Sequence, residues 1–116
     1  MSEELKLRTK KFAHRCVRLA MALPNTKLGN HIQGQLIRCS TSVASNYRAA
    51  RLAQSKAGFI SKLSIVIEEA DESYFWLEFI TDENMIKRDL IDPLFKEADE
   101  LTAIFIASRK TARNDA

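Results

Sequence analysis

Glycine, proline and cysteine are all scarce in this 116-residue chain, which holds three glycines, two prolines and two cysteines. So few glycines and prolines exclude a loop-rich sandwich, a barrel and a collagen-like chain. Two cysteines without a CxxC pair give no disulfide framework. Because Cys16 and Cys39 lie among apolar neighbours on helical patterns, we expect buried, reduced thiols in a cytoplasmic protein.

Long hydrophobic runs are absent as well. The longest one, residues 74–80, is interrupted by Glu78 and is far shorter than the ~20 residues of a membrane-spanning helix. The polar, acidic start of the chain differs from a secretory signal. A chain of this length has room for a single core, so we expect one domain over residues 1–116 and no membrane partner.

The apolar residues that are present recur at steps of three and four, which is typical of helices. They predict four helices, over about residues 4–23, 29–52, 55–81 and 87–112, with Ser55 as an N-cap. Asp92 and Pro93 leave two alternatives for the last helix: a kink in its first turns, or a helix that begins there with Asp92 as its cap. Similar lengths and short connections predict an all-α, up-down-up-down four-helix bundle. The predicted core stripes are Leu5, Thr9, Phe12, Cys16, Leu19 and Leu23; Ile32, Leu36, Cys39, Val43, Asn46 or Tyr47, and Ala50; Phe59, Leu63, Val66, Ala70, Ser73 and Leu77; Leu90, Leu94, Ala98, Leu101 and Phe105.

The third predicted helix carries more apolar side chains than one bundle core accommodates. A helix with one wet side has a polar arc opposite its core stripe, yet Ile65, Trp76 and Ile80 interrupt that arc. An exposed aromatic cluster typically marks an interaction surface. The alternative is that Trp76 and Phe79 merely cover the end of the core. We expect self-association, with these interface residues: Tyr74, Trp76, Phe79 and Ile80.

Charge is divided unevenly along the chain, whose net charge is +3. Residues 1–62 hold 12 Lys or Arg and 2 Glu, a charge of +10, whereas residues 63–116 hold 6 Lys or Arg and 13 Asp or Glu, a charge of −7. A basic surface that meets an acidic surface of a neighbouring copy forms a head-to-tail contact, and such contacts close into rings when the rotation permits.

Cations recur at steps of three and four on the first helix and form a ridge that attracts phosphates. The candidate nucleic-acid-binding residues on this basis are Arg8, Lys11, Arg15, Arg18, Arg38, Arg48 and Arg51. The alternative is that these cations pair with acidic helices, within or between subunits. The protein would then be a structural adaptor whose partner is another protein.

Nothing in the sequence points to catalysis. His14 and His31 are solitary, and the acidic residues 68–72 lack the nearby histidine that a di-iron bundle site needs. His14 lies two residues from Cys16, so the two face different sides of a helix. No glycine-rich phosphate loop is present. We therefore expect no enzymatic activity, no metal and no cofactor.

Three stretches carry a resemblance to a known family: residues 35–50 (QLIRCSTSVASNYRAA), 53–63 (AQSKAGFISKL) and 68–78 (EEADESYFWLE). In their order and spacing the chain resembles the bacterial four-helix-bundle proteins named after the 23S rRNA intervening sequence, also labelled S23 ribosomal protein. Much of that family reads Asn-Ile-Ala-Glu-Gly where this chain has residues 46–50, NYRAA. The difference indicates a sub-branch, and any role of the missing glutamate does not carry over.

The resemblance implies a left-handed bundle that assembles as a ring-shaped homopentamer. Family members are encoded within insertions in 23S rRNA genes or stand alone, and their role is largely unassigned. A related accessory protein of diversity-generating retroelements forms a similar basic pentamer that binds nucleic acid and a reverse transcriptase. We therefore expect a non-catalytic homo-oligomer, a ring of five, that binds RNA or DNA through its positive half.

Overall fold

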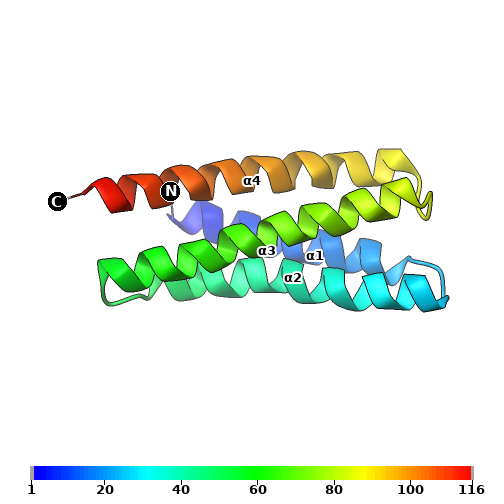
Figure 1. Ribbon diagram of the computed structural model, residues 1–116, viewed down its shortest axis with the longest axis horizontal. Helices are drawn as coiled ribbons and strands as arrows, with labels where there is room; N and C mark the ends of the chain where they lie inside the picture. The colour runs from blue at the N-terminus through cyan, green and yellow to red at the C-terminus, as the bar shows by residue number, and fades with distance from the viewer. Residues whose placement is uncertain (1, 116) are drawn as a thin grey trace.

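The computed structural model describes residues 2–115, which form four long helices that run alternately up and down (Figure 1). The helices are α1 (Ser2–Met21), α2 (Lys27–Arg51), α3 (Lys56–Asp82) and α4 (Arg88–Asn114). Each bound lies within two residues of the position that the apolar spacing predicts. Residues 2–115 contain no strand, so the prediction of an all-α chain with four helices is confirmed.

The helices pack around a square in chain order. Each helix contacts the one before and the one after it, and α1 also contacts α4, less extensively than it contacts α2. The diagonal pairs, α1 with α3 and α2 with α4, make no close backbone contact. The resulting body is elongated, 50 × 21 × 20 Å. Its outermost positions are therefore four corners, each made by one helix, and four seams between neighbours.

Two helices begin at side-chain caps. Ser55 Oγ accepts a hydrogen bond from the Gly58 N–H at 3.0 Å, which confirms the predicted cap of α3. In α2 the cap is Thr26, whose Oγ1 accepts from the Gly29 N–H at 3.0 Å. The helix therefore starts two residues before Gly29, the predicted first residue. A Cβ at Gly29 would lie 1.9 Å from the carbonyl oxygen of Pro24, so only glycine fits where this turn closes.

The start of α4 differs from the second of the two predicted alternatives, because the helix begins at Arg88 and continues through Pro93. Pro93 is exposed in the second turn, where it lacks the N–H that would donate to the Asp89 carbonyl. The prediction of Leu90 in the core is wrong, since its side chain is 60% exposed. The buried positions instead recur at steps of three and four from Ile91, namely Ile91, Leu94, Ala98, Leu101 and Phe105.

A single hydrophobic core joins all four helices, and the predicted stripe of α1 is buried in it at every position. On α2 the sequence left open whether Asn46 or Tyr47 occupies the core position. Tyr47 occupies it, and its ring lies 5.4 Å from that of Phe105. Asn46 is only half-buried and donates a hydrogen bond to the Ser42 carbonyl at 3.0 Å. The core is thus closed by an aromatic pair between α2 and α4.

One predicted interface residue belongs to this core. Ile80 is fully buried within the single chain, so the prediction that it interrupts the wet face of α3 is wrong. Its position explains the difference, because Ala70, Ser73, Leu77 and Ile80 continue the buried stripe at steps of three and four.

Among residues 2–115, no helix combines the length and apolar character that a membrane crossing requires.

Candidate nucleic-acid interface

Arg8, the first of the candidate phosphate-binding residues, is paired within the chain. Its Nε lies 3.1 Å from Oε2 of Glu97 and its Nη2 lies 2.7 Å from Oε1, so the guanidinium holds the carboxylate with two hydrogen bonds. Glu100 accepts a further bond at 3.3 Å. All three side chains lie in the seam between α1 and α4, and Arg8 therefore joins two helices instead of offering a free charge.

Arg38 has a similar role in the seam between α2 and α3. Its guanidinium donates to Glu69 at 3.0 Å and also to Glu72. The Trp76 Nε1–H donates to the same Glu72 carboxylate at 3.1 Å. These donors favour the ionised carboxylate, and the Arg38 hydrogen bond above all lowers the pKa of Glu72 below its usual value. The indole N–H of the half-buried Trp76 is thereby held at the seam between α2 and α3.

Arg51 is the third paired candidate. At the end of α2 it donates to Oε1 of Glu3 on α1 at 3.0 Å, and this contact lowers the pKa of Glu3. For Arg8, Arg38 and Arg51 the structure thus has the pairing with acidic side chains within the chain that the sequence left open as an alternative. Sequence spacing cannot reveal such pairs, because each joins residues at least 31 positions apart.

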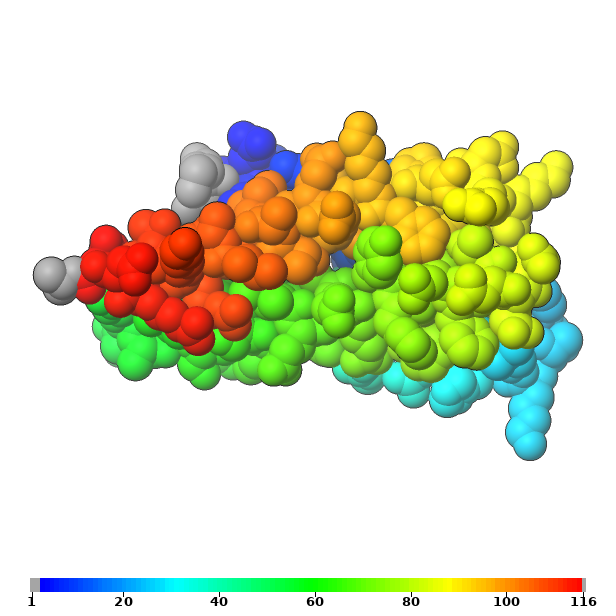
Figure 2. Space-filling view, turned by 45° about the horizontal axis from the view of Figure 1, so that its top comes forward, coloured from blue at the N-terminus to red at the C-terminus, as the bar shows by residue number. Residues whose placement is uncertain are grey.

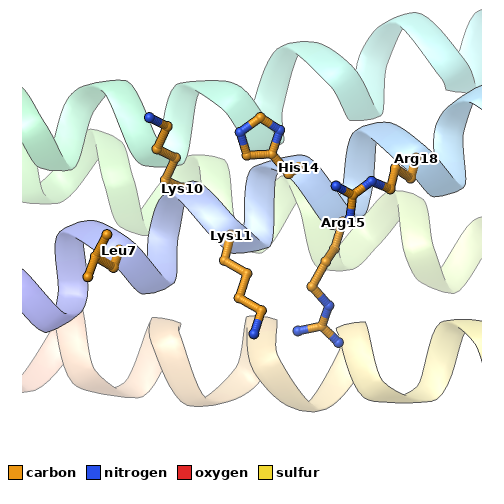
Figure 3. A pocket seen from close by; sticks show the side chains of 6 residues that line it. All are labelled: Leu7, Lys10, Lys11, His14, Arg15 and Arg18. Atoms are coloured by element: carbon orange, nitrogen blue, oxygen red, sulfur yellow. The ribbon is translucent and has the colours of Figure 1, made fainter.

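Lys11, Arg15, Arg18 and Arg48 differ from these three. Within residues 2–115 none of the four makes an ion pair or a hydrogen bond with another side chain. In Figure 3, Lys11 and Arg15 extend from α1 toward α4, whereas Lys10 and His14 extend toward α2. The basic surface of α1 is therefore divided between its two seams.

A hollow lies on the α4 side of α1, next to Arg15 and Arg18. It has a volume of about 370 Å³, and its floor is mostly apolar. Asp89, at the start of α4, is the one acidic residue of its lining. The two guanidiniums thus border a surface that holds few competing carboxylates. The lining residues are Arg15, Arg18, Leu19, Ala22, Ile86, Asp89, Leu90, Pro93 and Leu94.

A groove of about 450 Å³ lies on the opposite side of α1, in the seam with α2. Small side chains form its floor, chiefly Ala13, Val17 and Ala44, and cationic side chains stand around them. This groove is not among the features predicted from the sequence, although its α1 residues recur at steps of three and four, which places them on one side of a helix. Its lining consists of Lys6, Lys10, Ala13, His14, Val17, Thr41, Ala44, Ser45 and Arg48.

The aromatic residues of α3 form a cluster at the surface. The Phe75 ring lies 4.9 Å from that of Trp76 and 6.0 Å from that of Phe79. Trp76 and Phe79 are half-buried against the core, and Tyr74 packs on Phe95 at 4.9 Å. Phe75 is the most exposed of the set at 47%, although it was not among the predicted interface residues.

The groups that could act as nucleophiles are held inactive. Cys16 and Cys39 are buried, and burial raises the pKa of both thiols, that of Cys39 to about 11. Both therefore stay protonated at neutral pH. Over residues 2–115, no group of three or more His, Cys, Asp or Glu side chains is arranged to hold a metal ion.

Comparison with known proteins agrees with the resemblance in the sequence. Residues 4–107 match the family described as 23S rRNA-intervening sequence protein. A solved structure from Bacteroides thetaiotaomicron VPI-5482, described as a protein with unknown function from the S23 ribosomal protein family, is 33% identical to this chain. It superposes with a TM-score of 0.85 over 91% of this chain and 98% of that chain. No curated protein matches the sequence.

Proposed function

Because the chain belongs to the 23S rRNA-intervening sequence protein family, we propose that it is a non-catalytic, homo-oligomeric protein that binds the phosphates of RNA or DNA. The binding surface consists of Lys11, Arg15 and Arg18, which line one hollow on the exposed side of α1. One observation carries this proposal: these three cations line one hollow on α1 and have no acidic partner among residues 2–115, whereas three of the other four arginines of the basic half are paired.

A surface of this kind binds without reading sequence. Cations that follow a helix at steps of three and four attract the phosphate backbone, and binding releases counterions. Three phosphate contacts in each copy give a slope of log K against log salt of about −2.7 on duplex DNA and about −2.1 on a single strand. No aromatic side chain lines the hollow beside Arg15 and Arg18, so stacking on bases contributes little there.

Self-association is part of the proposal. The family resemblance implies a left-handed bundle for each chain and a ring of five chains for the assembly. Exposed apolar side chains support it, since Leu7 is 66%, Met21 64% and Phe75 47% exposed. Repetition of the basic surface around a ring would raise the avidity for a long polyanion. Light scattering on the purified protein measures the mass, and a monomer at micromolar concentration would contradict this part.

The binding part is tested by fluorescence anisotropy with short labelled RNA and DNA, single-stranded and duplex, over a series of salt concentrations. We expect measurable binding at low salt, weakened steeply by added salt. Arg15→Glu/Arg18→Glu is expected to weaken binding at least ~10-fold and to flatten the salt slope, with the oligomer mass unchanged. Absence of binding by the wild type at low salt would remove the proposal.

A matched control carries the same change in charge elsewhere. Lys110→Glu/Arg113→Glu alters two exposed cations near the end of α4, about 24 Å along that helix from the hollow. We expect this control to retain most of the affinity. An equal loss in both variants would mean that only the total charge matters, and that α1 holds no defined binding surface.

The alternative function is a structural adaptor for another protein. It is supported by the pairing of Arg8, Arg38 and Arg51 within the chain, which leaves fewer cations for phosphates. It is also supported by the mostly apolar groove between α1 and α2. The same titration separates the two functions, because an adaptor shows no nucleic-acid binding at low salt.

A further inference from the structure

The groove between α1 and α2 has an apolar floor and a positively charged border, and together these two properties favour one kind of binding partner. Its floor of Ala13, Val17 and Ala44 is apolar, and its charged members, Lys6, Lys10 and Arg48, are all cationic. No carboxylate lines it. An elongated surface with acidic groups on its flanks and one apolar side chain at its centre fits such a groove. A bare phosphate chain would leave the apolar floor unused.

The outward corner of α3 has these features. Glu68, Asp71, Glu78 and Asp82 are exposed at steps of three, seven and four residues, and none of them makes an ion pair among the described residues. Phe75 occupies the missing step between Asp71 and Glu78, at the centre of the row. We name these five residues the acidic ridge. It extends about 21 Å along α3.

The lengths of the two surfaces agree. The α1 side of the groove runs from Lys6 to Val17, which is about 17 Å of helix. Among the described residues no ion pair joins the ridge to the groove cations, and α1 and α3 lie at diagonal corners of the bundle without contacting each other. Figure 2 shows the face formed by α3 and α4, with α3 running along its whole length and open to solvent.

We propose that the acidic ridge of one copy docks into the α1–α2 groove of the next copy, with Phe75 over the apolar floor and the ridge carboxylates beside Lys6, Lys10 and Arg48. This inference rests on the self-association in the proposed function and assigns its surfaces. The contact is head-to-tail, since each copy offers a groove to one neighbour and a ridge to the other, and such contacts close into a ring when the rotation between copies permits. It leaves Lys11, Arg15 and Arg18, which line one hollow on α1, outside the contact and free for phosphates.

Charge reversal in solution tests the docking. Lys10→Glu/Arg48→Glu reverses the groove, and Asp71→Lys/Glu78→Lys reverses the ridge. All four residues are exposed and none is in an ion pair with another described residue, so we expect the helical content of both variants to match that of the wild type. Each variant places like charges opposite one another, which is expected to raise the dissociation constant of the assembly at least ~10-fold. Analytical ultracentrifugation measures it.

The combined variant is the decisive case. A chain with all four substitutions has an acidic groove and a basic ridge, so we expect it to regain the assembly that each double variant loses. A matched control, Asp99→Lys/Lys110→Glu, reverses two exposed charges on α4 and is expected to keep the wild-type mass. Wild-type assembly in either double variant, or no recovery in the combined one, would overturn the docking. A monomeric wild type would instead refute the self-association of the proposed function. Nucleic-acid binding is tested separately, because the effect of Arg15→Glu/Arg18→Glu on it depends neither on the docking nor on the self-association.

Discussion

The outward corners of α1 and α3 lie across the bundle from each other and carry opposite charge. α1 presents Lys11, His14 and Arg18, whereas α3 presents the acidic ridge. Neither set has a partner of opposite charge within the described chain, while the arginines in the seams, Arg8 and Arg38, each contact two carboxylates. The two seam arginines Arg8 and Arg38 are therefore neutralised, whereas the exposed charges of these two corners and the cations of the α1–α2 groove are not. A net charge of +3 conceals two strong and separate surfaces.

We expect the largest difference in stability between a substitution on the buried side of α3 and one on its exposed side. Ile80→Ala leaves a cavity in the closed core and is expected to lower the free energy of unfolding by about 2–5 kcal/mol. Phe75→Ala removes a half-exposed ring and is expected to cost less than about 1 kcal/mol in the isolated chain. Urea unfolding followed by circular dichroism gives both values. A small loss for Ile80→Ala would contradict the inward direction of its side chain.

The same pair also separates folding from assembly. If Phe75 contacts a neighbouring copy, Phe75→Ala weakens the dependence of Tm on protein concentration, because association stabilises the folded chain by mass action. Ile80→Ala is expected to lower Tm equally at all concentrations. Thermal unfolding at several protein concentrations measures this difference, and an unchanged concentration dependence for Phe75→Ala would place that ring outside any interface.

A seam arginine and a free arginine on α1 are the next comparison. Arg8→Ala removes a two-point contact with the half-buried Glu97 and is expected to cost about 1 kcal/mol of stability. Arg15→Ala removes a side chain without an acidic partner and is expected to change stability by less than about 0.5 kcal/mol, while it weakens nucleic-acid binding. Chemical unfolding and anisotropy together give the two readouts. The reverse order of stability losses would contradict the division between seams and corners.

The smallest expected effect is a loss of stability at acid pH that arises from Glu72, in the seam between α2 and α3. The pKa of Glu72 is lower in the folded chain than its ordinary value of 4.5, chiefly because Arg38 donates to it. The unfolded state therefore binds the proton first, and the contribution of this carboxylate is complete above about pH 4.5 and is lost as the pH falls through the lower folded pKa. We expect Glu72→Gln to flatten the fall of Tm with acid. Glu78→Gln, at an exposed position of the ridge, is the matched control, and identical acid profiles for the wild type and Glu72→Gln would refute this account.

Much of the fold was predictable from the sequence because helical periodicity is a local property. The stripe from Leu5 to Leu23, the cap at Ser55 and the polar breaks depend on neighbours within one or two turns. Local periodicity does not decide which of two adjacent residues takes one inward position. At Leu90 and Ile91, and at Asn46 and Tyr47, the local pattern permits either choice, and contact with the other helices decides.

The candidate site was less predictable. Sequence spacing identified the cations of α1 as one row, yet Arg8 and Arg15 from that row have different environments. The many apolar side chains of α3 predict an exposed Ile80, which is buried, and the spacing of the acidic residues alone does not single out the acidic ridge with Phe75 as one surface. Neighbours across a seam are needed to tell a paired charge from a free one.

The local pattern of residues was enough for the number of helices, for their bounds to within two residues, for the cap of α3 at Ser55 and for the separation of charge into a basic and an acidic half. Packing of the four helices was needed to establish which cations meet carboxylates, which member of each adjacent pair points inward, and that α1 and the acidic ridge of α3 lie at diagonal corners of the bundle. The physical reason is one of range. Backbone hydrogen bonds and apolar periodicity act within a few residues, whereas the rotation of each helix about its axis is fixed by the interlocking of core side chains from all four helices.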